Sequence, residues 1–566
     1  MSATSESVIT ASITPGFFIE RGVRSTSRAL VVSALVLIVL VGFGFRAVQL
    51  SAEGLSEDEL NKLVAVEDYR AHGLTPANGE HPMLMKALLT ASIVAAEYWN
   101  RTALVASNPQ LRAPTETALR LPGAIFGALT SLLIFLVASE LFGTEIGLIA
   151  AALWALDPSA IGFNRIAKED SFLLFFFLLA NTFWLRGQRV AESGHGRPEP
   201  YYWATAAAFG AMMASKYVPH YFAISTSYYY IFQGVPATRW RVGWRRWLVF
   251  FAIMGATFIA CNPTILLPGT WREMAVFAGE KRIGHDAYEF MGSLYRNQMT
   301  LWLKGSPWYF YYVFMAVKIP LPVIVSFLVG LVLLFRRRTG DGRFFLLFWL
   351  LLWFLPFTVM GGKFTRYFTM ALPVVLMTAA IGAHHIAQQL SEKLDAVFGN
   401  SGAVRGYARS GVAALVLAFP AFASASALPH YRLYTTTMGG GWERAGSYFP
   451  HDEFYDSSAR EAVEEIARRA RPGARVASET PGLISHYAQL AGRGDLVSVS
   501  LSDKAAMRQF AEGDLIIVAR GRRYFSNDAL IERLQERSAP VASVSLGGVP
   551  SIRIFVLDKV SLTAIQ

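Results

Sequence analysis

The sequence contains little charge and almost no cysteine. Of its 566 residues, 16% are Asp, Glu, Lys or Arg, whereas an average soluble domain has about 25%. A surface that faces water on all sides needs more charge, so this value excludes an ordinary soluble enzyme and a disordered chain. The single cysteine, Cys261, excludes a disulfide within the chain.

Hydrophobic residues are abundant instead. They make up 53% of the chain, and the mean hydropathy is +0.35. Apolar runs long enough to cross a bilayer recur from Ala29 to Leu428. We expect a polytopic α-helical membrane protein with about eleven transmembrane helices. The first run begins at Ala29 and has no convincing cleavage site, so we interpret it as an uncleaved helix. The later spans are expected at 118–141, 146–163, 171–186, 201–215, 217–233, 247–267, 310–335, 344–360, 367–389 and 410–428.

The basic residues predict the orientation of these spans. The net charge is +11, and the excess lies in alternate connections rather than on one aromatic-rich face, which argues against a nucleic-acid binder. Basic loops favour the cytoplasmic side, so we expect the N-terminus there and, after an odd number of spans, the C-terminus outside. The connections that hold this excess include Arg21–Arg28, Arg186–Arg197, Arg239–Arg246, Arg336–Arg343 and Lys393–Arg409.

From Pro429 onward the hydropathy falls and helix and strand patterns alternate. Ser458 and Glu461 have the spacing of a capping box, followed by an apolar helical face. We therefore predict two domains, a membrane domain over 1–429 and a small extracytoplasmic α/β domain over 430–566. Residues 430–450 are expected to join the two flexibly. The C-terminal domain lacks a glycine-rich phosphate loop, which argues against a nucleotide site.

Ionisable residues gather in the connections that the topology places outside. Each set has a structural explanation: the acids could complement a helix N-terminus, and the cations could anchor spans at the interface or snorkel. Their convergence on one membrane face nevertheless favours a functional site. The residues are Glu57, Asp58, Glu59, His81, Lys86, Arg165, Lys168, Asp170, Lys216 and Arg366. The 268–306 loop adds His285 and four aromatic residues, which could stack on sugars or form an interfacial belt.

The order of these motifs resembles glycosyltransferase family 39, which includes protein O-mannosyltransferases and lipid A aminoarabinose transferases with the GT-C fold. The motifs in question are the acidic pair Asp58-Glu59, Glu80-His-Pro-Met-Leu-Met-Lys86, Arg165 to Asp170, Lys216-Tyr217, Pro307-Trp-Tyr309 and Arg366-Tyr367. Met83 and Met85 depart from the proline and glycine usual in the family.

The resemblance implies transfer of a sugar from a polyprenyl-phosphate carrier to a hydroxyl on protein, lipid or glycan, usually with inversion. It implies Asp58, Glu59 and Asp170 as catalytic residues, although the base assignment could shift by one residue within Glu57–Glu59. Lys86, Arg165, Lys216 and Arg366 are the expected donor phosphate-binding residues, and His81, His285 and Tyr367 the expected substrate-binding residues. We expect no cofactor; the alternative is Mg²⁺ held by Glu57, Asp58, Glu59 and Asp170.

We therefore expect a bacterial plasma-membrane glycosyltransferase that meets a lipid-borne donor and binds no nucleic acid. The alternative is a lipid or solute transporter that uses the same outer cavity without chemistry. Transporters usually carry charges near the membrane midplane, on broken helices of inverted repeats. Here the ionisable residues lie at outer span ends, which favours the enzyme. A scaffold whose exported domain binds a partner is compatible with either function.

Overall fold

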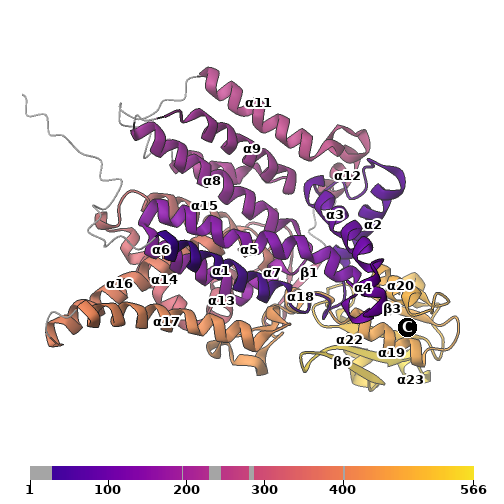
Figure 1. Ribbon diagram of the computed structural model, residues 1–566. Helices are drawn as coiled ribbons and strands as arrows, with labels where there is room; N and C mark the ends of the chain where they lie inside the picture. Colours follow the sequence, from indigo (N-terminus) through magenta and orange to yellow (C-terminus); the bar gives the residue numbers. More distant parts are fainter. Residues whose placement is uncertain (1–27, 194–195, 229–243, 280–285, 399–401, 566) are drawn as a thin grey trace, which may run out of the picture.

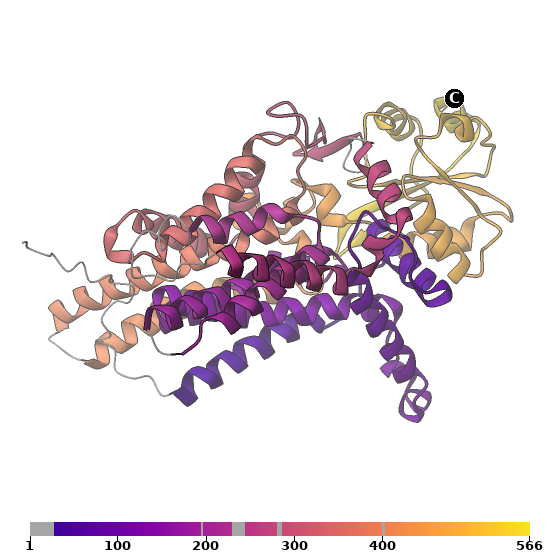
Figure 2. The same ribbon diagram turned by 90° about the horizontal axis from the view of Figure 1, so that it is seen from above.

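In the computed structural model, the described residues are 28–193, 196–228, 244–279, 286–398 and 402–565. An elongated bundle of helices carries a smaller domain at one end (Figure 1), and the view from above shows the same arrangement (Figure 2). The bundle consists of α1 (Arg28–Ala47), α5 (Thr115–Phe142), α6 (Thr144–Leu156), α7 (Pro158–Asn164), α8 (Glu169–Ser193), α9 (Glu199–Ser215), α10 (Phe222–Tyr228), α11 (Trp244–Cys261), α13 (Phe310–Lys318), α14 (Leu321–Leu334), α15 (Arg343–Val359), α16 (Leu372–Phe398) and α17 (Gly402–Ala427).

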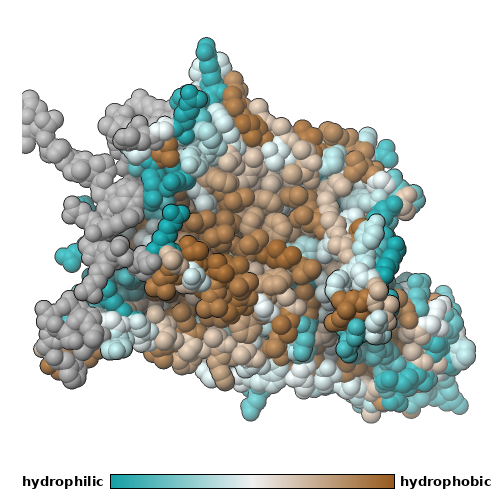
Figure 3. Space-filling view, in the orientation of Figure 1, coloured by the Kyte–Doolittle hydropathy of each residue, from teal (hydrophilic) through white to brown (hydrophobic). Residues whose placement is uncertain are grey.

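The surface of the bundle is that of a multi-pass membrane protein. Figure 3 shows an apolar belt across the middle of the bundle, with hydrophilic residues toward both ends. Within the described ranges, four helices are long and apolar enough to cross a membrane: α1, α5, α11 and residues 406–427 of α17. A fifth span results if α6 and α7, which are bent by 61°, count as one. The expected count of about eleven is therefore not confirmed.

Local breaks account for part of this difference. The predicted span 146–163 divides into α6 and α7 at Asp157, because Pro158 starts a new helix. The predicted span 310–335 divides into α13 and α14 at Pro320, which has no backbone N–H to continue the first helix. The predicted span 217–233 contains only the seven-residue α10 up to Tyr228, and its last residues lie outside the described ranges.

A second group of elements covers the end of the bundle that carries the smaller domain (Figure 1). These are α2 (Glu57–His72), α3 (Met83–Asn100), α4 (Ala103–Ser107), α12 (Pro268–Gly279) and a hairpin of β1 (Ala287–Phe290) and β2 (Ser293–Arg296). Single 3₁₀ turns complete the connections: η1 (Pro109–Leu111), η2 (Pro219–Tyr221), η4 (Pro263–Leu266), η5 (Arg337–Thr339), η6 (Thr365–Met370), η7 (Tyr431–Leu433), η8 (Thr437–Gly439) and η9 (Gly441–Arg444).

The C-terminal elements form a three-layer α/β/α domain. Its five-stranded sheet has the order β4-β3-β5-β7-β6, in which β3 pairs in parallel with β4 and β5, while β7 pairs antiparallel with β5 and β6. Apolar residues of α19 and α20 cover one face of the sheet, and those of α21 and α22 cover the other. The elements are α18 (Pro450–Phe454), α19 (Ala459–Arg469), β3 (Arg475–Ser478), α20 (Pro481–Leu490), β4 (Val497–Ser500), α21 (Lys504–Met507), β5 (Leu515–Ala519), α22 (Asp528–Arg537), β6 (Ala542–Leu546), β7 (Val549–Val556) and α23 (Lys559–Ile565).

This domain shares a hydrophobic core with the loop helices. One cluster of buried residues includes Leu60 and Leu63 of α2, Met85 of α3, Val463 of α19 and Ile484 of α20. Burial of apolar area stabilises such a contact by roughly 25 cal/mol per Å². The domain is therefore packed onto α2 by the same kind of interaction that holds its own layers together.

Two local expectations for the C-terminal segment were wrong. The side chain of Ser458 makes no capping hydrogen bond to α19; its oxygen accepts one from Ser551 instead, at 2.7 Å. The segment 430–450 is held to the bundle rather than joined loosely to it. Arg432 pairs with Glu53 at 2.6 Å, and Lys318 donates to the carbonyls of Arg432 and Tyr434.

Candidate active site

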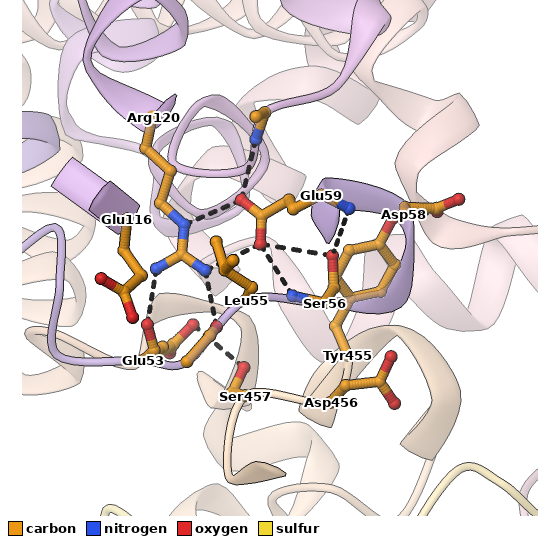
Figure 4. Close-up of polar contacts among 12 residues, drawn as sticks. Glu53, Leu55, Ser56, Asp58, Glu59, Glu116, Arg120, Tyr455, Asp456 and Ser457 are labelled. Atoms are coloured by element: carbon orange, nitrogen blue, oxygen red, sulfur yellow. Dashed lines mark hydrogen bonds and ion pairs between the residues drawn. The ribbon is translucent and has the colours of Figure 1, made fainter. Parts of the chain in front are cut away.

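The N-terminus of α2 presents three consecutive acids in three directions. A capping box fixes this terminus: the Ser56 hydroxyl accepts the Glu59 N–H at 3.3 Å, and the Glu59 carboxylate accepts the Ser56 N–H at 3.0 Å. Successive helical residues point about 100° apart. Figure 4 accordingly shows Asp58 and Glu59 on opposite sides of the helix end.

Glu59 points inward and is an anchor. Its carboxylate takes two hydrogen bonds from Arg120 of α5, at 2.8 and 2.7 Å, and one from the Ala167 N–H at 3.0 Å. Arg120 also donates to the carbonyls of Leu50, Glu53 and Gly54. Glu59 is 1% exposed and both of its carboxylate oxygens accept hydrogen bonds, so in this structure it anchors the start of α2, and its catalytic role stays a prediction.

Asp58 points toward cations of other segments, Lys168 and Arg366. Its Oδ2 lies 2.8 Å from Lys168 Nζ and accepts a hydrogen bond from the Tyr455 hydroxyl at 2.5 Å, while its side chain remains 37% exposed. Burial disfavours the charged form, but Lys168, Arg366 and Tyr455 outweigh it and hold the pKa of Asp58 well below its usual range. The third acid, Glu57, turns instead to Arg522 of the C-terminal domain, at 3.1 Å. Asp58 is thus an accessible, ionised carboxylate at neutral pH.

A chain of alternating charges extends from Asp58 into the protein. Lys168 Nζ lies 3.9 Å from Glu169 Oε2, and Glu169 Oε1 lies 2.8 Å from Lys62 Nζ and 3.3 Å from His81 Nδ1. Burial lowers the pKa of His81 well below its usual value, and the nearby Glu169 does not reverse this, so the ring is neutral at pH 7. The structure thus brings His81 beside the site through an acid, Glu169, that sequence analysis did not select.

Asp170 and Lys216 form a second ion pair in the same region. Their charged atoms are 2.6 Å apart, and the Lys216 ammonium lies 5.2 Å from the centre of the Tyr367 ring. Three residues spread over about 200 positions of the sequence therefore meet at one site.

Arg366 belongs to η6 and completes the cluster. Its guanidinium lies 4.1 Å from the centre of the Phe364 ring and 5.9 Å from that of Tyr455. Asp452 Oδ1 lies 3.6 Å from Arg366 Nη1, which makes no hydrogen bond to any of the described residues. Asp452 is itself fixed, because its Oδ2 accepts from the Thr365 N–H and the Tyr288 hydroxyl. Arg366 is therefore held in place with donor capacity to spare.

Lys86 is not available to a phosphate in this structure. It is fully buried, and its ammonium donates to the backbone carbonyls of Ala77, Asn78 and His81, at 3.2, 2.7 and 3.0 Å. An ammonium has three N–H donors, and these three carbonyls use all of them. In this structure Lys86 therefore clamps the turn before α3, and its phosphate-binding role stays a prediction.

Arg165, whose predicted phosphate contact stays a prediction, binds the end of α1 in this structure. Its guanidinium donates to the carbonyls of Phe45, Arg46, Val48 and Gln49, at the C-terminal end of α1. Helix C-termini leave such carbonyls unpaired, and a cation there satisfies them. The remaining candidate, His285, lies outside the described residues.

Four residues of the cluster were missed by sequence analysis: Lys62, Glu169, Asp452 and Tyr455. A weak signal existed for two of them. Lys62 is the only basic residue in the first half of α2, and Glu169 adjoins the selected Asp170. Asp452 and Tyr455 carried no signal, because they come from the segment assigned to a separate domain.

The expected acids do not assemble into a metal site. Among the described residues there is no group of three or more His, Cys, Asp or Glu side chains placed to hold an ion. The carboxylates proposed for Mg²⁺ are instead paired individually with cations: Glu57 with Arg522, Asp58 with Lys168, Glu59 with Arg120 and Asp170 with Lys216. They would have to exchange these partners to share one ion.

Comparison with known proteins identifies the fold. The family profile "Dolichyl-phosphate-mannose-protein mannosyltransferase" matches residues 104–266. The apo oligosaccharyltransferase of Archaeoglobus fulgidus superposes with a TM-score of 0.50 at 11% identity, covering 87% of this chain and 70% of that one. ArnT from Cupriavidus metallidurans bound to undecaprenyl phosphate gives 0.48 at 12% identity, covering 94% and 98%. No curated protein sequence matches the chain. The chain has the GT-C fold of membrane glycosyltransferases, as its motifs predicted.

The Lys86 clamp makes a prediction that separates it from a phosphate ligand. We expect Lys86→Met to lower the free energy of unfolding by about 3 kcal/mol or more, because it leaves buried carbonyls without donors. Folded Lys86→Met should bind polyprenyl phosphate as the wild type does. Thermal unfolding in detergent and a binding titration would measure the two effects, with the exposed Lys304→Met as the control. Unchanged stability with lost lipid affinity would restore the phosphate-binding role.

Proposed function

We propose that this protein transfers a sugar from a polyprenyl-phosphate-linked donor to an acceptor hydroxyl at the outer face of the membrane, with inversion. The observation that carries the proposal is Asp58: an accessible, ionised carboxylate within a cluster of partly engaged cations, at one end of an apolar bundle. The GT-C fold and the matched family profile support a lipid-phosphate donor. Mannose is the sugar to test first, since the profile names it.

The proposed reaction assigns each group a part. Asp58 Oδ1 takes the proton from the acceptor hydroxyl, whose oxygen forms the new bond to the anomeric carbon. The bond from that carbon to the phosphate oxygen breaks, and polyprenyl phosphate leaves with the bonding electrons. Arg366 and Lys216 stabilise the charge that develops on the leaving phosphate. Asp170 holds Lys216 in place, and Asp452 does the same for Arg366.

The arrangement also suits the place where such a donor resides. The carrier chain lies in the bilayer and its phosphate at the interface, so a receiving site should lie where an apolar surface meets a polar one. The cluster joins Asp58 of α2 to Asp452 of α18 and to Tyr455 directly after it, and Figure 1 shows α2 and α18 at the end of the bundle that carries the smaller domain. We propose the plasma membrane of a bacterium as the location, with this end outside.

Asp58→Asn should abolish transfer, with at least a tenfold loss, because general-base catalysis is worth about 10²–10⁴-fold. The assay supplies polyprenyl-phosphate [¹⁴C]mannose to membranes of a strain lacking the protein, which contain the natural acceptors, and adds purified enzyme. Asp68→Asn is the matched control, because Asp68 lies on the same helix and, among the described residues, bonds only to His72 and Thr75 at the surface. A loss of less than tenfold would reject Asp58 as the base. Movement of intact donor across the membrane without label transfer would favour a transporter.

Arg366→Ala should weaken donor binding by about tenfold or more, since a hydrogen bond to a charged group contributes roughly 1.5–3 kcal/mol. Arg366→Lys should recover only part of the affinity, because an ammonium does not reproduce the planar fork. Titration with polyprenyl phosphate would measure both variants. Arg337→Ala, which alters an exposed turn away from the cluster, is the control. Equal affinity of Arg366→Ala and wild type would exclude Arg366 from the phosphate site.

A further inference from the structure

Residues 450–457 form a strap that enters the site from the C-terminal segment. The strap consists of α18 and the turn that follows it, and it contributes Asp452 to Arg366 and Tyr455 to Asp58. Tyr455 and Asp456 both have positive φ angles, 47° and 60°. Residues other than glycine rarely adopt this left-handed backbone conformation, so two of them in succession need strong support from their surroundings.

Asp456 supplies that support by fastening the turn to α2. Its carboxylate accepts the Glu57 backbone N–H at 3.1 Å and the Arg522 Nε–H at 2.7 Å. Arg522 in turn lies 3.1 Å from the Glu57 carboxylate. Glu57 directly precedes Asp58, so the strained turn is attached to the residue beside the proposed base.

Tyr455 acts on one oxygen of that base. Its hydroxyl donates to Asp58 Oδ2 at 2.5 Å, and Lys168 approaches the same oxygen at 2.8 Å. In the part of the chain that the structure describes, no hydrogen bond or ion pair reaches the other oxygen, Oδ1. The two donors therefore fix the carboxylate plane and leave Oδ1 for an incoming hydroxyl.

We propose that Tyr455 is a positioning residue that orients Asp58 toward the acceptor. Because Tyr455 belongs to the C-terminal segment, the site is complete only when the C-terminal domain is docked. This inference rests on the proposed function for its catalytic consequence. The contact itself does not depend on that function, because the hydroxyl, the carboxylate and the fastened turn are features of the free protein.

The contact also affects the protonation of Asp58. The groups that face this carboxylate are Lys62 on its own helix, His81 from the turn before α3, Lys168 from the turn before α8, Arg366 of η6 and Tyr455. The Tyr455 hydroxyl bonds to the charged form and so lowers the pKa of Asp58. Removal of the hydroxyl therefore raises the pKa of Asp58. At a pH above the pKa of Asp58 in both the wild type and the variant, a larger fraction of Asp58 is then protonated in the variant.

The test is Tyr455→Phe in the full-length chain, with two measurements. Carbodiimide modifies protonated carboxyl groups, so its rate at Asp58, followed by peptide mass spectrometry at pH 5, should rise several-fold, because loss of the Tyr455 hydroxyl raises the pKa of this carboxyl. In the sugar-transfer assay, kcat should fall about three- to tenfold while KM for the donor is unchanged, because donor phosphate contacts remain. Modification of the exposed Glu443 serves as the internal reference.

Tyr448→Phe is the matched control. It removes a hydroxyl just before the strap, and this hydroxyl donates to the Gly439 carbonyl rather than to Asp58. Asp456→Asn is the second variant; Asn tolerates the left-handed conformation, so it should fold and show the same changes in smaller degree. A wild-type modification rate at Asp58 in Tyr455→Phe would overturn the inference, as would an unchanged kcat. If the wild type transfers no sugar but Tyr455→Phe accelerates modification, the proposed function fails while the positioning contact is supported.

Discussion

The buried pair of Glu59 and Arg120 is the interaction on which the site depends. It joins four separate pieces of chain: the start of α2, the residues 50–54 before it, α5, and the turn before α8 through the Ala167 N–H. A buried pair of this kind contributes little net stability, because desolvation offsets much of its attraction. Its main contribution is geometric. Both oxygens of the Glu59 carboxylate and the Arg120 guanidinium are engaged. The positions at which α2 and α8 begin are therefore set by the hydrogen bonds of this pair.

That geometry explains why the site consists of alternating charges. With α2 and α8 fixed, Asp58 meets Lys168, and Lys62 meets Glu169, which follows Lys168 in the chain. Each cation near the proposed phosphate position thus has an acid beside it. An isolated buried cation would tend to lose its proton or move to water. A paired one stays charged and in place, which is the preorganisation that stabilising a leaving phosphate requires.

The sequence predicted the membrane class, the α/β pattern of the C-terminal segment and the convergence of polar turns at one end of the bundle. It could not decide between neighbouring acids, because Asp58 and Glu59 differ by one residue and by about 100° of helix rotation. It also could not show which groups satisfy Lys86, whose apolar surroundings suggested a ligand of a phosphate. The carbonyls that satisfy Lys86 belong to a turn, and backbone groups leave no trace in residue identity. Hydropathy also treats as continuous two apolar runs that the structure divides at Asp157 and Pro320.

The C-terminal segment shows a further limit of dividing a chain by composition. Its charge and strand patterns differ from those of the bundle, which suggested an accessory unit joined by a loose connection. Yet Arg432 and Glu453 bind Glu53 and Lys318 of the membrane domain, and Tyr455 reaches Asp58. The composition of a segment reflects whether it faces water or lipid. A polar site, in contrast, forms from segments whose opposite charges pair with one another. Glu53 is matched by Arg432, and Lys318 by Glu453, both from the segment that follows α17. The two parts are therefore one unit in their electrostatics, although they are two in their hydropathy.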